Sequence, residues 1–194
     1  MIELPDTDKW NRIYQKNKHD NLQAARVLVE NQHLLPTTGR ALDAACGLAA
    51  NARLLAGHGL QTHAWDISNE AIDRIRKSIK GLDIQLTLQQ RDIVTNPPDE
   101  KSFDVIVVSR FLDRHLVKHL IAALRQDGLI FYQTFIKHKK DDVGPGNPHY
   151  LLDDNELLAL FRPLHIVLYR EEGKVGNLDA GFRNEAMLIA QRRL

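Results

Sequence analysis

Three aspartates of this chain each stand at or near the end of a predicted strand. Asp43 lies in "ALDAACG", Asp66 closes "THAWD" and Asp92 follows "LTLQQR". A carboxylate behind a strand can accept hydrogen bonds from a ribose diol, which is the role expected of Asp66. Asp92 could accept from an exocyclic amine, although each aspartate alone would also suit a helix start or a solvated loop. Three carboxylates at three successive strand ends together predict a nucleoside site on one rim.

The turn after Asp43 is rich in small residues and leads at once into a predicted helix. Residues 45–49 read A-C-G-L-A. The first turn of a helix has N–H groups without helical partners, and small residues let a ligand approach them. Any tight connection between a strand and a helix has a similar composition, so the turn alone leaves both interpretations open.

Strands and short helices alternate along most of the chain, which predicts parallel βαβ units with helices on both faces. After a helix at 21–35, the predicted strands are 41–45, 62–65, 84–88, 103–108 and 128–135, and the predicted helices are 51–57, 70–80, 116–124 and 153–161. Two final strands, 164–170 and 185–191, have no helix between them and should form an antiparallel hairpin. We therefore expect a doubly wound α/β fold with a mostly parallel sheet of about seven strands and an antiparallel last strand. Ligands of such sheets bind at the carboxyl ends of the strands, where strand order reverses.

Length and composition narrow the class of protein. The 194 residues suit a single domain over 1–194, divided into an N-terminal lid and helix (1–36) and an α/β core (37–194). A net charge of +1 argues against nonspecific binding to nucleic acid. A single cysteine, Cys46, excludes an internal disulfide or a multi-cysteine zinc site. Neither a signal peptide nor a membrane span is expected. We expect a cytoplasmic protein with a small-molecule substrate and without a resident metal.

The ordered set "ALDAACG", "AWDIS", "RDI", "FDVIVVSRFL" and "GLIFYQTF" resembles class I S-adenosylmethionine-dependent methyltransferases. "HLLP" before the first strand and "GPGNPHYLLDDNELLALF" after the fifth are similar to the tellurite-resistance-like subgroup. The likeness covers residues 9–192. It implies a Rossmann-like methyltransferase fold, S-adenosylmethionine as cofactor, and methyl transfer to a small-molecule acceptor.

The resemblance also implies individual roles. The turn 45–49 would hold the methionine part of the cofactor, Asp66 the ribose and Asp92 the adenine, beneath an N-terminal cover made by Trp10 and Tyr14. The implied cofactor residues are Trp10, Tyr14, Asp43, Ala45, Cys46, Gly47, Ala49, Asn51, Asp66, Ile67, Ser68, Asp92, Ile93, Ser109, Arg110 and Phe111.

Arg110 is the first choice to orient the acceptor, because it leaves the fourth strand beside the expected sulfonium. A protic acceptor must also lose a proton, for which His138 is the candidate base. Further side chains predicted to reach the same rim are Arg114, Tyr132 and Tyr150. The polar, glycine-containing segment 137–148 predicts a lid over the site.

Two departures from the family pattern concern the turn and the last loop. The family usually has glycine where Ala49 stands, and alanine pays roughly a kcal/mol at positive φ, so cofactor binding without this cost would require the turn to keep negative φ there. Ala45 replaces the first glycine of the pattern, a substitution frequent in the subgroup. The tellurite-resistance proteins carry a His-Arg pair between the last two strands, whereas this chain has Lys174 and Arg183 without histidine. Tellurite is therefore not expected as the substrate.

Other functions remain as alternatives. A nicotinamide-dependent dehydrogenase would require G-x-G-x-x-G, of which "ACGLAA" keeps one glycine. A protein that binds S-adenosylmethionine or a nucleoside without catalysis would fit the same residues. "NPPD" at 96–99 and "NPHY" at 147–150 resemble the motif of nucleic-acid amino methyltransferases, but we interpret both as turns. His115 and His119 lack the glutamate of a zinc-protease motif.

Overall fold

The computed structural model describes residues 6–16 and 23–193. In chain order the elements are α1 Asp6–Lys16, α2 Arg26–Val29, the 3-10 helix η1 Gln32–Leu34, β1 Arg40–Ala44, α3 Ala50–Gly57, β2 Gln61–Asp66, α4 Asn69–Ser78, β3 Leu86–Gln90, β4 Phe103–Ser109, α5 Val117–Ala123, β5 Leu124–Phe135, the 3-10 helix η2 Pro148–Tyr150, α6 Glu156–Leu160, β6 His165–Glu171 and β7 Glu185–Gln191. Within these residues no helix is long and apolar enough to cross a membrane.

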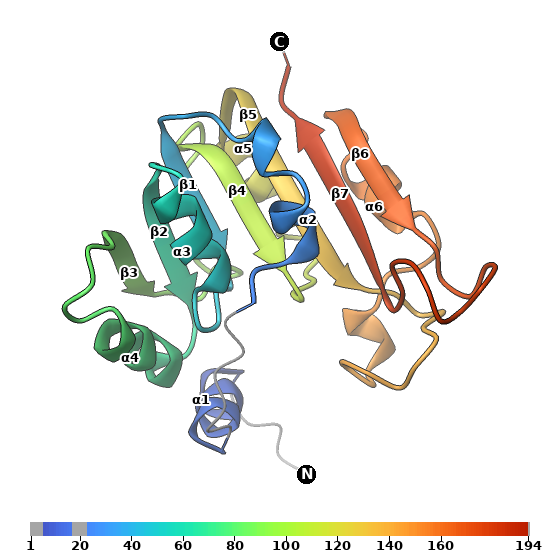
Figure 1. The fold of residues 1–194 in the computed structure, drawn as a ribbon, viewed down its shortest axis with the longest axis horizontal. Coiled ribbons are helices and arrows are strands. Elements are labelled where there is room, and N and C mark those ends of the chain that lie inside the picture. Colours follow the sequence, from blue (N-terminus) through green and yellow to red (C-terminus); the bar gives the residue numbers. More distant parts are fainter. Residues whose placement is uncertain (1–5, 17–22, 194) are drawn as a thin grey trace.

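Seven strands form one sheet in the order β3-β2-β1-β4-β5-β7-β6 (Figure 1). All neighbours pair in parallel except β7, which is antiparallel to both β5 and β6. The order reverses beside β1, since β1 lies between β2 and β4. This confirms the predicted doubly wound sheet with a reversed last strand.

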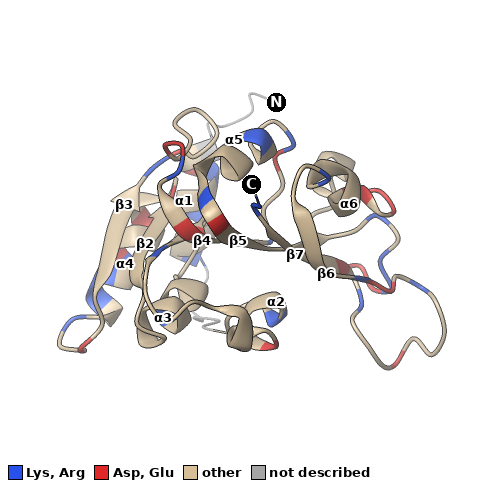
Figure 2. Ribbon diagram, turned by 90° about the horizontal axis from the view of Figure 1, so that it is seen from above, with Lys and Arg blue, Asp and Glu red and all other residues tan. Residues whose placement is uncertain are grey.

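Helices cover both faces of the sheet, with α2 and α3 on one face and α5 and α6 on the other (Figure 2). Strand β4 shows why both faces must be covered. Val105 and Val107 pack into the cluster that contains Val27 and Leu55, whereas Ile106 and Val108 pack into another cluster on the opposite side. A strand buried on both faces reads as a continuous apolar run, as "FDVIVV" does.

The predicted helix at 21–35 is wrong in extent. Among the described residues it is one turn of α-helix, α2, followed by the 3-10 turn η1, while residues 21 and 22 lie outside the described part. Side chains from distant elements accept hydrogen bonds from the backbone amides at the start of α2. The amide N–H of Ala25 donates to Asn51 Oδ1 at 2.8 Å, and that of Val27 donates to Gln133 Oε1 at 2.9 Å. Tertiary contacts therefore override the local helical pattern.

The strand predicted at 128–135 begins earlier, because β5 starts at Leu124 and ends the preceding helix at Ala123. Leu124 pairs with Phe103 of β4. The side chain of Arg192 donates to the carbonyl of Leu124 at 2.7 Å, which supports the extended backbone at this point.

Helix α1 is a helix that the sequence analysis treated only as a polar lid segment. It lies beyond the carboxyl ends of β1 and β2, next to α4 (Figure 1). Asn11 Oδ1 accepts hydrogen bonds from Ser68 Oγ at 2.7 Å and from the Glu70 amide at 3.3 Å. Arg74 donates to the carbonyl of Tyr14 at 2.8 Å. These bonds hold α1 against the start of α4, over the edge where ligands of such sheets bind.

Candidate functional site

A cavity of about 760 Å³ lies at the carboxyl ends of β1, β2, β3 and β4. Its walls come mainly from α1, the turn after β1, the segments after β2, β3 and β4, and residues 144–147 and 150. The predicted residues that line it are Trp10, Tyr14, Ala45, Cys46, Gly47, Asn51, Asp66, Ile67, Asp92, Ile93, Ser109, Arg110, Phe111 and Tyr150. Its volume is within the usual range for small-molecule sites, about 300–1,000 Å³.

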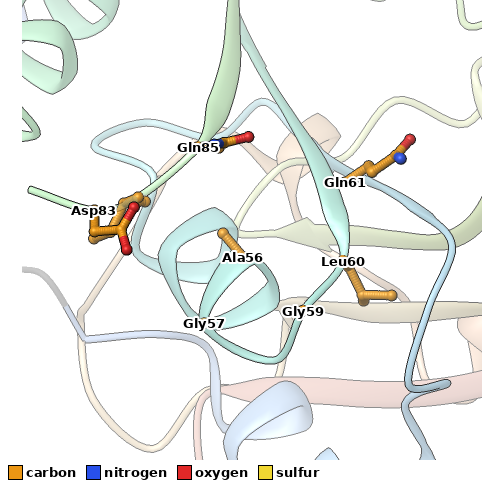
Figure 3. Close-up of a pocket in the computed structure, with 8 residues that line it drawn as sticks. Ala56, Gly57, Gly59, Leu60, Gln61, Asp83 and Gln85 are labelled. Atoms are coloured by element: carbon orange, nitrogen blue, oxygen red, sulfur yellow. The ribbon is translucent and has the colours of Figure 1, made fainter.

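A second cavity, of about 300 Å³, lies at the opposite edge of the sheet, between the end of α3 and the segment before β3 (Figure 3). Its lining comprises Ala56, Gly57, Gly59, Leu60, Gln61, Asp83, Ile84 and Gln85. Asp83 is the one ionisable residue among these lining residues. Because binding sites bring several polar groups together, the larger cavity is the better candidate.

The turn after β1 adopts a left-handed backbone at alternate residues. The φ angles are 53° at Ala45, 55° at Gly47 and 61° at Ala49. Ala49 therefore does not have the negative φ that would spare the turn this cost. The Ala49 amide donates to the Cys46 carbonyl at 2.8 Å, so the tight turn retains a glycine-like conformation although alanine costs about 1–2 kcal/mol there.

Two features of the turn favour glycine at position 47: its positive φ and the close approach of Tyr14. A Cβ built on Gly47 would lie 2.9 Å from the hydroxyl oxygen of Tyr14. Burial, together with the charge of Asp66, raises the pKa of Tyr14 well above its usual value, so its hydroxyl stays protonated. The helix α1 and the turn thus meet at a point where only glycine leaves room.

Asp43 lies behind the turn and not on the cavity wall. Its side chain is fully buried; Oδ2 accepts from the Ala52 amide at 3.0 Å and Oδ1 from Asn51 Nδ2 at 3.2 Å. Burial raises the pKa of Asp43 to about 7, against the lowering effect of those hydrogen bonds. Asn51, which does line the cavity, also donates to Ser109 Oγ at 3.0 Å. Asp43 therefore positions Asn51 and the start of α3.

Asp66 does line the cavity, at the end of β2. Its Oδ2 accepts from the Gly47 amide at 2.8 Å and its Oδ1 from the Ser68 amide at 2.9 Å. Burial raises its pKa to about 6, and the two backbone hydrogen bonds limit the rise. Each carboxylate oxygen has two lone pairs, so both retain acceptor capacity. Ser68 is instead fully buried and caps α4 through the Ala71 amide at 3.2 Å.

Asp92 and Ile93 follow β3 and line the same cavity. The Asp92 carboxylate accepts from the Val94 amide at 3.0 Å and from Thr95 Oγ1 at 2.8 Å, which keeps it in a fixed turn. Arg91 lines the cavity beside it, and its guanidinium lies 4.0 Å from the ring of Trp65. Along the sheet the order is Asp92 after β3, Asp66 at the end of β2 and the turn after β1, so the carboxylate expected to bind the ribose lies between the residues expected to bind the adenine and the methionine part.

Arg110 lies on the other side of the cavity, after β4. Its backbone is left-handed, with φ 55°, and its amide donates to the Gln133 carbonyl at 2.7 Å. Its Nε donates to Glu185 Oε1 at 2.8 Å. Glu185 is buried and accepts a second bond, through Oε2, from the side chain of Gln133. The predicted orienting residue is thus held by a buried network.

Three residues that were predicted to reach the rim do not line the cavity. His138 does not line the cavity; its ring pairs with Asp154 at 2.8 Å on the surface, with 70% of the side chain exposed. Tyr132 is buried and donates to the Phe111 carbonyl at 2.9 Å, so it does not reach the rim. Arg114 pairs with Glu156 at 2.6 Å and holds the segment that carries Tyr150.

The cavity wall also contains residues that were not predicted, which are Lys9, Gln23, Ala50, Arg74, Arg91, Val94, Leu112 and Phe135. Gly144, Pro145, Gly146 and Asn147, which also line it, belong to the segment predicted as a lid. Arg91 could have been found as the residue before Asp92. Lys9, Gln23 and Arg74 give no such signal, because their places depend on how α1 lies across the sheet.

Comparison with known proteins finds methyltransferases, both among protein families and among solved structures. Residues 41–128 match the family described as "Methyltransferase domain". TehB from Haemophilus influenzae is 18% identical with a TM-score of 0.70, and the match covers 95% of this chain and 67% of that one. An S-adenosylmethionine-dependent methyltransferase from Methanosarcina mazei is 17% identical with a TM-score of 0.67, and the match covers 89% of this chain and 99% of that one. No curated protein matches the sequence.

The [4+2]-cyclase SpnF also has this fold, at 14% identity and a TM-score of 0.67 over 95% of this chain and 81% of that one. At such identities the likeness to solved structures shows the fold alone. The family match gives residues 41–128 a methyltransferase domain, and the strand order is that of the class I S-adenosylmethionine-dependent methyltransferase fold. The chain is an enzyme of this class, and its cofactor is S-adenosylmethionine.

Proposed function

We propose that this methyltransferase acts on a small-molecule acceptor, which Arg110 orients. The observation that carries the proposal is one cavity with two kinds of wall. Asp66 and Asp92 stand on the β2–β3 side, and Arg110 stands on the β4 side. The first side suits the nucleoside part of the cofactor, which leaves the second for the acceptor.

The residues present fit S-adenosylmethionine. We assign the ribose hydroxyls to Asp66, whose buried carboxylate keeps free acceptor sites, and the adenine to Asp92 and Ile93. The turn with Gly47, where a side chain would collide with Tyr14, is assigned to the methionine part. When bound, the cofactor supplies a methyl group on a sulfonium, which passes to a nucleophile while the electron pair of the broken bond returns to sulfur.

The chain's own contribution is alignment and exclusion of water. Trp10 and Tyr14 cover the cavity from α1, and Phe111 lines it after β4. Burial raises the pKa of the Cys46 thiol, which therefore stays protonated on the wall. No histidine is among the described residues that line this cavity, so we do not retain His138 as the base. Asp43 acts through Asn51 rather than on the cofactor.

The sequence motifs support placement in the tellurite-resistance-like subgroup, and TehB has the same fold. Tellurite is not proposed as the acceptor. Arg183, in the loop where that subgroup carries its His-Arg pair, is engaged by its own loop. It donates to the carbonyls of Gly173 at 3.0 Å, Val175 at 2.8 Å and Asn177 at 2.7 Å. Its guanidinium is thus committed to holding that loop.

Calorimetry tests the cofactor site. S-adenosylmethionine and S-adenosylhomocysteine should bind, and NAD should not. Asp66→Ala should lose at least about 100-fold in affinity, since two hydrogen bonds to a charged acceptor are worth about 1.5–3 kcal/mol each.

Asp83→Ala, in the second cavity, is the matched control and should bind the cofactor normally. Unchanged affinity in Asp66→Ala, with the fold intact by circular dichroism, would sink the ribose assignment. Transfer of a labelled methyl group to members of a panel of thiols, acids and oxyanions tests the class of acceptor. Tight cofactor binding without transfer to any of them would contradict a small-molecule acceptor of these classes.

A further inference from the structure

The guanidinium of Arg110 is held from one side and open on the other. Its Nε donates to Glu185, whereas Nη1 and Nη2 donate to no residue in the described part of the chain. The side chain is 59% exposed and lines the cavity. Arginine presents its N–H donors as a planar fork that matches the two oxygens of a carboxylate. The open pair of nitrogens is therefore a preformed half of such a contact.

A buried network fixes the direction of this fork. Glu185, 6% exposed, is bonded to both Arg110 and Gln133, and Gln133 Oε1 accepts from the Val27 amide at 2.9 Å. The backbone of Arg110 is tied to the Gln133 carbonyl as well. Elements β5, β7 and α2 thus hold one guanidinium. A group positioned before its ligand arrives loses less conformational entropy on binding.

The strand order places this group away from the cofactor's side. The sheet runs β3-β2-β1-β4-β5-β7, and Asp66 and Asp92 follow β2 and β3. Glu185 opens β7 opposite Phe135, the last residue of β5. The Arg110 guanidinium lies 5.9 Å from the Phe135 ring. The guanidinium therefore lies on the side of β5 and β7, and β4 separates it from the turn assigned to the methionine part.

The cavity that the fork faces also has aromatic and cationic side chains on its wall. Phe111, Phe135 and Tyr150 line it, and Lys9, another lining residue, has its Nζ 5.4 Å from the Tyr150 ring. A Cβ built on Gly144 would lie 2.6 Å from Cε1 of Phe135, so the backbone of residues 144–147 lies against that ring. Both acidic residues on the cavity wall, Asp66 and Asp92, belong to the nucleoside side.

We propose that the methyl acceptor is a small organic acid with an aromatic or apolar body, whose carboxylate binds Nη1 and Nη2 of Arg110. Glu185 is the positioning residue for this contact. The proposal rests on the proposed function, because it requires the cofactor on the opposite side of the cavity. It separates this acceptor from an inorganic oxyanion, which would have no use for the aromatic wall.

The test is calorimetry on full-length protein saturated with S-adenosylhomocysteine. Benzoate, phenylacetate and hexanoate are titrated, each against its neutral amide. At least one acid should bind tenfold or more tightly than its amide. Arg110→Gln should abolish that preference and change the affinity for S-adenosylhomocysteine less than threefold. Arg76→Gln, a surface arginine of α4 paired with Asp73, is the matched control and should behave as wild type.

Each other outcome overturns the proposal. Equal binding of acids and amides, or no binding of any acid, shows that no carboxylate is recognised. Binding of selenite without binding of the acids assigns the site to inorganic oxyanions. A loss of S-adenosylhomocysteine affinity of tenfold or more in Arg110→Gln assigns the fork to the cofactor's own carboxylate. Failure of wild type to bind S-adenosylhomocysteine removes the proposed function itself.

Discussion

Replacing the buried carboxyl of Asp43 by an amide should destabilise the protein at acid pH but not at alkaline pH. Burial raises the pKa of Asp43 from 3.8 to about 7 in the folded protein. The folded state therefore holds a proton that the unfolded chain has released. The associated stability is fully present below pH 4 and is lost as pH rises toward 7. A difference of about three pKa units corresponds to about 4 kcal/mol.

Asp43→Asn removes this ionisation and also one acceptor. The amide can accept from Asn51 or from the Ala52 amide, but not from both, so one buried donor loses its partner at a cost of about 1–3 kcal/mol. The variant should therefore be less stable than wild type at pH 4.5. Between pH 4.5 and pH 8 wild type should lose about 3 kcal/mol more than the variant, which makes the variant equal or more stable at pH 8.

Urea unfolding followed by circular dichroism at pH 4.5, 6 and 8 measures this difference. All groups common to both proteins, including Asp66 with its raised pKa, cancel when the two are compared. Asp83→Asn, an exposed carboxyl, is the control and should follow wild type at each pH. If Asp43→Asn is destabilised by the same amount at pH 4.5 and pH 8, Asp43 does not titrate as its burial requires.

Two further outcomes concern the cofactor site. Because burial raises the pKa of Asp66 to about 6 and binding needs its carboxylate, affinity for S-adenosylhomocysteine should fall about tenfold for each pH unit below 6, and equal affinity at pH 5 and 7 in calorimetry would contradict this. Ala45→Gly and Ala49→Gly should each change the free energy of unfolding by less than about 1 kcal/mol, since relief of left-handed strain offsets the lost methyl group and the greater freedom of the unfolded chain. Ala52→Gly, at a position as buried as Ala49 but inside α3, should lose about 1.5–2 kcal/mol in the same urea titrations, and equal losses in all three variants would refute the strain at positive φ.

The sequence predicted the elements whose pattern is local. Apolar runs and amphipathic periods gave all seven strands and the order of helices between them, because side-chain periodicity of two or 3.6 residues reports which faces are buried. The cavity-lining places of Asp66 and Asp92 followed from the same reasoning, since parallel strands end at one edge. Element ends were less accurate: β5 begins at Leu124 because of pairing with β4, and α2 is shortened by bonds from Asn51 and Gln133.

The places that sequence reasoning missed depend on partners far along the chain. Asp43 ends its strand as Asp66 does, but its carboxyl lies under the start of α3 instead of on the cavity wall. His138 pairs with Asp154 on the surface. Nothing in the residues around either one signals these partners, because the direction of each side chain depends on packing.

By itself, the sequence determined a doubly wound sheet and a carboxylate-lined rim, because both follow from local periodicity and residue type, and its motifs resemble those of methyltransferases. Only the tertiary structure decided the conformation of the turn and the state of Arg110. The left-handed φ of Ala49 results from the tight turn between β1 and α3, against the preference of alanine. The carboxylate that holds Arg110 comes from Glu185, at the start of a strand 75 residues away. Burial and long-range hydrogen bonding select such arrangements, and neither is written in a short stretch of sequence.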